Sequence, residues 1–176
     1  MTAPKIVVKQ IFWHRSLILA AVFLLFCGAA RANGLIITNG EVLDQNTSEN
    51  TVSVKFDLSW QNGWKDGVNH DAVWVFMKYS DDDGKTWKHA TLALSGTNPA
   101  GFYKGDGTSL DLVVPQDLKG LIARRASSGS GPVATTGLKL VWDYGLDSVD
   151  PEKVLSSLVV KLFAIEMVYV PQGAFY

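Results

Sequence analysis

The stretch that decides the fold is TVSVKFDLSW, residues 51–60, in which apolar and polar side chains alternate strictly. Val52, Val54, Phe56, Leu58 and Trp60 occupy every second position. Because successive side chains of a strand point to opposite faces of a sheet, this period of two predicts a β-strand with one buried and one solvated face.

More strand-like segments follow this one. Residues 72–79, AVWVFMKY, are nearly all apolar and rich in aromatic and β-branched types, which is typical of a central strand covered on both faces. Shorter candidates, separated by Gly, Asn, Asp, Pro and Ser, are residues 35–38, 85–94, 109–115, 120–124, 137–143 and 159–170. We therefore expect an all-β fold, an antiparallel β-sandwich of Greek-key or immunoglobulin-like kind.

Three local features complete this prediction. Trp74 and Trp142 fall inside apolar strands and are expected to be core residues. ASSGSGP, residues 126–132, is expected to be a flexible hairpin connection. DSVDPEKVLSS, residues 147–157, holds either a helical turn, capped by Asp147 or Ser148, or a loop.

The first 32 residues have the pattern of a signal peptide. Lys5, Lys9 and Arg15 precede the apolar stretch 17–27, and Ala30-Arg31-Ala32 offers small residues at a cleavage site. Eleven apolar residues would rise about 16 Å as a helix, roughly half of a hydrocarbon core, which disfavours the alternative of a membrane anchor. We expect cleavage before Asn33 and export to the periplasm or the extracellular space of a bacterium.

Removal of this leader changes the chemistry of the chain. The leader carries four of the 16 basic residues and no acid, so the formal net charge falls from −1 to about −5, which disfavours binding to nucleic acid. The one cysteine, Cys27, leaves with the leader. The mature chain then has no thiol for a disulfide, for catalysis or for a metal.

The candidate ligand contacts are Trp60, Trp64, His70 and Asp71, in SWQNGWKDGVNHD, residues 59–71. The two rings flank QNG, which is expected to be a polar turn in a loop, and there they could stack on a sugar or close the end of the sandwich. His70 and Asp71, with His89, could begin a metal or acid–base site, but no third ligand follows at a recognisable spacing. We expect no catalytic residue and no cofactor.

SDDDGKTW, residues 80–87, resembles the Asp-box of sialidases and related β-propellers. The resemblance implies a structural turn made by Ser80, Asp82, Gly84 and Trp87, in which the aspartate accepts backbone N–H groups and the glycine adopts a positive φ. The same aspartates could instead hold calcium, but the order of ligands in an EF-hand is not met.

EMVYVPQGAFY, residues 166–176, resembles the opening of the formylglycine-generating enzyme (sulfatase-modifying factor) domain. The matching positions are Met167, Val168, Val170, Pro171, Gly173 and Phe175. The preceding segment resembles the β-rich N-terminal region of exported bacterial members of that superfamily. In those enzymes two cysteines hold copper, or histidines hold iron in sibling branches, and these residues lie downstream of the opening strand. No position of this chain matches them.

These observations predict three parts: residues 1–32 as the signal peptide, 33–165 as the β-sandwich, and 166–176 as the opening strand of a truncated enzyme-like domain. The leading hypothesis is a secreted, non-catalytic module that tethers or positions that C-terminal domain, its partner. The alternative is a stand-alone carbohydrate-binding or adhesion module that contacts a glycan or another cell-surface component. The apolar strand 159–170 also predicts a tendency to aggregate.

Overall fold

The computed structural model describes residues 34–169 and 171, and this part of the chain consists mostly of strands. The strands are β1 (Ile36–Asn46), β2 (Thr51–Lys65), β3 (His70–Ser80), β4 (Lys88–His89), β5 (Gly96–Thr97), β6 (Asp106–Gly107), β7 (Leu110–Val114), β8 (Leu121–Arg125), β9 (Gly129–Asp143) and β10 (Val159–Tyr169). One short helix, α2, spans Pro151–Val154. All the pairings between these strands are antiparallel, so the predicted all-β, antiparallel fold is confirmed.

The predicted signal peptide, residues 1–32, lies outside the described residues, and so do residues 170 and 172–176 of the predicted enzyme-like strand. Within the described part, no helix has the length and apolar character needed to cross a bilayer.

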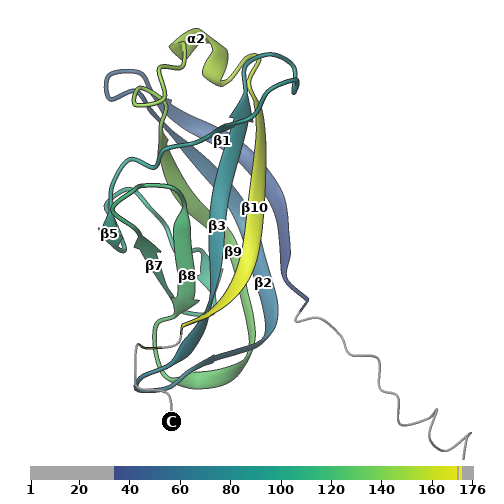
Figure 1. Cartoon of the computed structure of the whole chain (residues 1–176), viewed down its shortest axis with the longest axis vertical. Helices are drawn as coiled ribbons and strands as arrows, with labels where there is room; N and C mark the ends of the chain where they lie inside the picture. The colour runs from purple at the N-terminus through teal and green to yellow at the C-terminus, as the bar shows by residue number, and fades with distance from the viewer. Residues whose placement is uncertain (1–33, 170, 172–176) are drawn as a thin grey trace, which may run out of the picture. The chain divides into compact units, whose positions relative to one another are not determined.

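The strands form two layers that are joined at one end (Figure 1). β2 pairs with β1 and β9, and β6 extends this layer beyond β9. β3 pairs with β10 on one side and with β8 and β4 on the other, and β7 and β5 extend this layer beyond β8. β2 and β3 pair with each other only at Lys65 and His70, so the chain passes between the layers at that hairpin.

The alternating apolar residues of β2 face the other layer and form the core with the inward residues of β3 and β9. Phe56, Leu58 and Trp60 have no exposed surface, as the sequence pattern predicts. Tyr79 of β3 packs on Trp142 of β9, with ring centroids 4.9 Å apart, although these two strands do not pair. Each large apolar side chain buried in this way stabilises the fold by about 1.5–3 kcal/mol.

The prediction that β3 is covered on both faces, with Trp74 in the core, is wrong. Val73 and Val75 point inward and are fully buried, whereas Trp74 and Phe76 point outward and are only half-buried. The apolar run lacks alternation because its outward positions carry aromatic rings that pack on one another. Trp74 lies 4.5 Å from Phe76, centroid to centroid, and its indole N–H donates to the Lys119 carbonyl at 3.1 Å.

Two segments that were expected to be loops lie in strands. The QNG sequence is inside β2, which continues to Lys65. Residues 129–132 of the expected flexible connection begin β9, where Gly129 pairs with Lys65 and Gly131 with Gly63. Backbone pairing needs no apolar side chain, so side-chain patterns miss these ladder positions.

The helical turn forms, but its cap is neither Asp147 nor Ser148. Asp150 caps α2, because its carboxylate accepts the Glu152 backbone N–H at 3.0 Å, and Pro151 occupies the first helical position. Asp147 is engaged elsewhere, since its carboxylate accepts the indole N–H of Trp142 at 2.7 Å.

β10 pairs with β3 over its whole length, from Val159 opposite Ser80 to Tyr169 opposite His70. The domain boundary predicted between residues 165 and 166 therefore falls inside a continuous strand. Residues 166–169, which resemble the opening of the enzyme domain, belong to the same ladder as the residues before them.

Candidate functional site

Trp60 and Asp71 form a buried pair at the end of the sandwich where β2 passes to β3. The indole Nε1–H of Trp60 donates to Asp71 Oδ2 at 2.9 Å, and the backbone N–H of Trp64 donates to Asp71 Oδ1 at 2.8 Å. Trp60 has no exposed surface and Asp71 only 1%. The predicted ligand contact at these two residues is therefore wrong, and they close the end of the sandwich, which was the other alternative for the Trp60 ring.

The packing around the buried Trp60 ring requires a glycine at position 63. A Cβ atom at this position would lie 2.5 Å from the Val133 Cγ2 atom and 2.9 Å from the Trp60 Nε1 atom. Glycine thus lets the backbone of β2 pass over the buried indole ring. Trp64 is half-buried, so of the two predicted tryptophans it alone presents ring surface to solvent.

His70 lies at the start of β3, on the outward side of the sheet. Its ring stacks on Tyr169, with centroids 4.9 Å apart and an interplanar angle of 14°. The Arg124 Nη1 atom lies 3.4 Å from His70 Nε2. Partial burial lowers the pKa of His70, and the nearby charges of Arg124 and Lys65 lower it further. Because a guanidinium only donates, this contact requires a neutral ring that is unprotonated at Nε2.

Residues 80–87 form a hydrogen-bonded turn. The Asp82 carboxylate accepts the backbone N–H of Thr86 at 2.8 Å and the hydroxyls of Thr86 and Ser80 at 2.6 and 2.7 Å. These bonds lower the pKa of Asp82. Gly84 has a φ of +83°, and its carbonyl accepts the Trp87 indole N–H at 3.1 Å. A strand is expected over residues 85–94, but the turn continues to residue 87. Within that range only β4, Lys88–His89, forms a regular ladder.

One candidate surface is the outer face, which consists of the outward positions of β3, β8 and β10. Phe163 stacks on Phe76 with centroids 5.2 Å apart. Phe163, Ile165 and Met167 are 41%, 47% and 42% exposed, so apolar side chains stand at every second position along β10. The sequence pattern of β10 signals an apolar strand but does not tell which of its faces lacks a cover.

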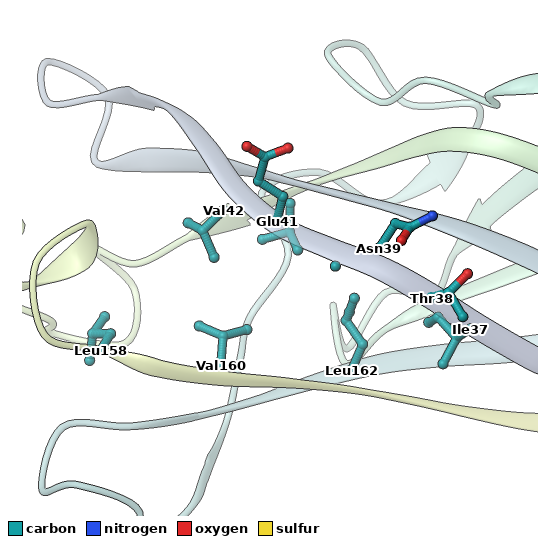
Figure 2. A pocket seen from close by; sticks show the side chains of 10 residues that line it. Ile37, Thr38, Asn39, Glu41, Val42, Leu158, Val160 and Leu162 are labelled. Carbon is teal, nitrogen blue, oxygen red and sulfur yellow. The ribbon is translucent and has the colours of Figure 1, made fainter.

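A second candidate is a recess of about 460 Å³ between the edge strands β1 and β10, lined by both apolar and polar groups. Figure 2 shows that Val42 points from β1 into this space, and that Val160 and Leu162 point into it from β10. Two of the polar side chains at its rim already have partners. Asn39 donates to Asp57 at 2.6 Å, and Glu41 forms an ion pair with Lys55 at 3.0 Å. The recess therefore offers both apolar and polar contact, and none of the residues predicted from the sequence as ligand contacts lines it.

The acidic groups of the described residues mostly serve the fold. Asp147 accepts the Thr91 backbone N–H at 2.9 Å and its hydroxyl at 2.7 Å, while Asp66 accepts the backbone N–H groups of Val68 and Asn69 at 2.7 and 2.6 Å. Within the described residues, no three or more His, Cys, Asp or Glu side chains gather in a way that could hold a metal ion.

Comparison of the chain with protein-family models, with curated proteins and with solved structures finds no match.

Proposed function

We propose that the described domain is a non-catalytic β-sandwich module of an exported protein, which positions a C-terminal domain of the formylglycine-generating type. The observation that carries this proposal is the outer face. β10 presents a row of exposed apolar side chains, and its last residues, 166–169, begin the segment that resembles the opening of the enzyme domain. An exposed apolar surface of this kind is typical of an interface with another domain.

The engagement of the acidic side chains supports a non-catalytic role. Asp71, Asp82 and Asp147 each accept several hydrogen bonds that hold strands or turns in place. A catalytic carboxylate needs free access to a substrate proton or to a metal ion. These three carboxylates instead take part in the packing of the domain.

The test begins with the coding sequence downstream of Tyr176. The chain is produced alone and together with the region that follows it, and both proteins are treated with hydrogen peroxide. Met167 is 42% exposed and should be oxidised readily in the chain alone but slowly in the longer protein. Met77, which is 1% exposed, is the matched control and should react slowly in both. Equal oxidation of Met167 in the two proteins, or a continuation unrelated to that enzyme domain, would refute the proposal.

A stand-alone carbohydrate-binding or adhesion module is the alternative function. Trp60 is buried, so this alternative rests on the half-exposed Trp64 and on outward rings such as Phe163. Retardation of the chain in affinity gels containing polysaccharides tests it, with Trp64→Ala and Phe163→Ala as variants. Retardation that either substitution abolishes supports the alternative, whereas migration unaffected by any glycan removes it.

A further inference from the structure

The outer face is basic as well as apolar. The outward positions of β3, β8 and β10 carry Lys78, Arg124 and Lys161 and no aspartate or glutamate. This sign is the reverse of that of the mature chain, whose acidic residues outnumber its basic ones. A partner that covers this face must therefore bring negative charge to complement it.

Arg124 is a half-buried cation of this face that has an unpaired nitrogen. Its Nε atom is buried and has no hydrogen-bond acceptor in the described part of the chain, and its Nη1 atom meets only the His70 ring, at 3.4 Å. Asp111 lies directly opposite Arg124 in the β7–β8 ladder, but its carboxylate is shared by Lys65 at 4.0 Å and Lys104 at 3.7 Å. The half-buried guanidinium thus forms no ion pair with a carboxylate of the described residues.

The surroundings of Arg124 suit a carboxylate that is flanked by apolar groups. The ring of Tyr169, which is 50% exposed, stacks on His70 beside the guanidinium. Met167, on the same face of β10 as Tyr169, adds apolar surface. Guanidinium and carboxylate form short, charge-assisted hydrogen bonds, and a partly desolvated site strengthens them.

We propose that Arg124, with His70 and Tyr169 beside it, binds a carboxylate of a polypeptide partner whose contact surface combines acidic and apolar side chains. A polypeptide fits better than a glycan because the exposed apolar side chains of β10 recur at every second residue, which matches the spacing of side chains on another polypeptide. This inference rests on the proposed function, in which the partner surface belongs to the C-terminal domain.

The site is tested on the full chain with two capped tripeptides, Phe-Glu-Phe and Phe-Gln-Phe, and with trigalacturonate as an anionic glycan. Binding is followed by NMR through the Arg124 Nε–H and His70 ring signals. The glutamate peptide should bind roughly tenfold more tightly than the glutamine peptide. It should also raise the pKa of His70, because it brings a negative charge next to the ring.

Variants separate the role of the guanidinium from a general effect of charge. Arg124→Gln should remove the preference for glutamate, and Arg124→Lys should retain part of it, because a lysine keeps the charge but loses the planar donor pair. Lys153→Gln, in α2 away from the outer face, is the charge-matched control and should change nothing. If Arg124→Gln does not fold, Arg124→Lys still tests whether the preference for glutamate depends on the guanidinium.

Equal binding of the two peptides, or a preference that survives Arg124→Gln, would overturn the carboxylate site. Tighter, Arg124-dependent binding of trigalacturonate would overturn the assignment to a polypeptide. Neither outcome depends on the oxidation of Met167, so failure of this inference can be told apart from failure of the proposed function.

Discussion

Asp71 is the residue on which the hairpin end of the sandwich depends. Its carboxylate accepts one hydrogen bond from the buried Trp60 indole N–H and another from the part-buried Trp64 backbone N–H. A buried donor that loses its acceptor costs about 1–3 kcal/mol. The sequence places Asp71 beside His70 and so suggests a site, whereas the contact with Trp60 depends on how β2 and β3 pack.

We predict that Asp71→Ala lowers the free energy of unfolding by about 2–4 kcal/mol, because one buried and one part-buried donor lose their acceptor. Asp71→Asn keeps one acceptor oxygen and should cost less. Urea denaturation followed by tryptophan fluorescence measures both. The control is Asp66→Ala, which removes a carboxylate from the exposed turn next to β3 and should cost less than Asp71→Ala. A loss for Asp71→Ala no larger than that for Asp66→Ala would contradict this account.

His70 makes the stability of the domain depend on pH at less acidic values than the aspartates do. Its folded-state pKa is lowered, so the folded state binds fewer protons than the unfolded chain. The stability that His70 contributes is present above the unfolded value of about 6.5 and is lost as the pH falls through the folded pKa. Asp57, Asp66, Asp81 and Asp82 also have lowered pKa values, but their contributions disappear only below about pH 4.

We therefore predict that the chain loses stability between pH 7.5 and pH 5 and that His70→Gln removes most of this loss, because glutamine does not titrate. Urea denaturation at several pH values measures the effect. A stability that is constant over this range in the parent chain would refute the prediction.

Among the elements, β10 shows how much of the fold can be read from its residues. Its apolar run predicts a strand, and that prediction holds over Val159–Tyr169. The run does not show that Leu162 faces the core while Phe163 faces outward, because both side chains are apolar. In β2 the strict alternation does distinguish the two faces, and the inward residues Val52 to Trp60 are buried as expected.

The sequence does not predict other features of the fold, because contacts between residues far apart in the chain determine them. β9 begins in a Gly- and Ser-rich segment, where the backbone of β2 provides the pairing and the side chains carry no signal. The hydrogen bond from Trp60 to Asp71 joins two different strands, so the local pattern around either residue does not show it. The outer face depends on the register that places Phe163 opposite Phe76, and no local pattern encodes that register.

The alternation within β10 yields a prediction at this scale. Leu162→Ala should lower the free energy of unfolding by about 2–3 kcal/mol, since Leu162 packs against the core beside β1. Ile165→Thr, which changes an outward position of the same strand and keeps the β-branched shape, should cost less than about 1 kcal/mol. Urea denaturation compares the two. Equal, small effects would show that β10 does not contribute to the core of this domain.

For the whole molecule, the outer face is an exposed apolar surface on an otherwise well-packed sandwich. Phe163, Ile165, Met167 and Tyr169 are all more than two-fifths exposed on one side of β10. Without a cover, such a surface favours association between copies of the chain. The resemblance of residues 166–176 to an enzyme domain and the exposure of this face lead to the same expectation of a neighbour.

We predict that the chain on its own associates in a concentration-dependent manner and that the double variant Phe163→Thr and Ile165→Thr shifts it toward the monomer, because less apolar surface is left to bury. Size-exclusion chromatography with light scattering gives the mass. Leu94→Thr, which also replaces an exposed apolar side chain but lies outside β10, is the control and should associate like the parent. A parent chain that stays monomeric at high concentration would contradict the prediction.

The positions of β1 and β10 determine how the domain would respond to a pulling force. Both are edge strands, held by β2 and β3 respectively, and both have their outer ends toward the β2–β3 hairpin, with Ile36 opposite Ser59 and Tyr169 opposite His70. Tension between these two points would enter at one end of the sandwich and break the ladder bonds of each edge strand one pair after another. The domain would therefore peel open from its edges, strand by strand, well before its central pairs carried any load.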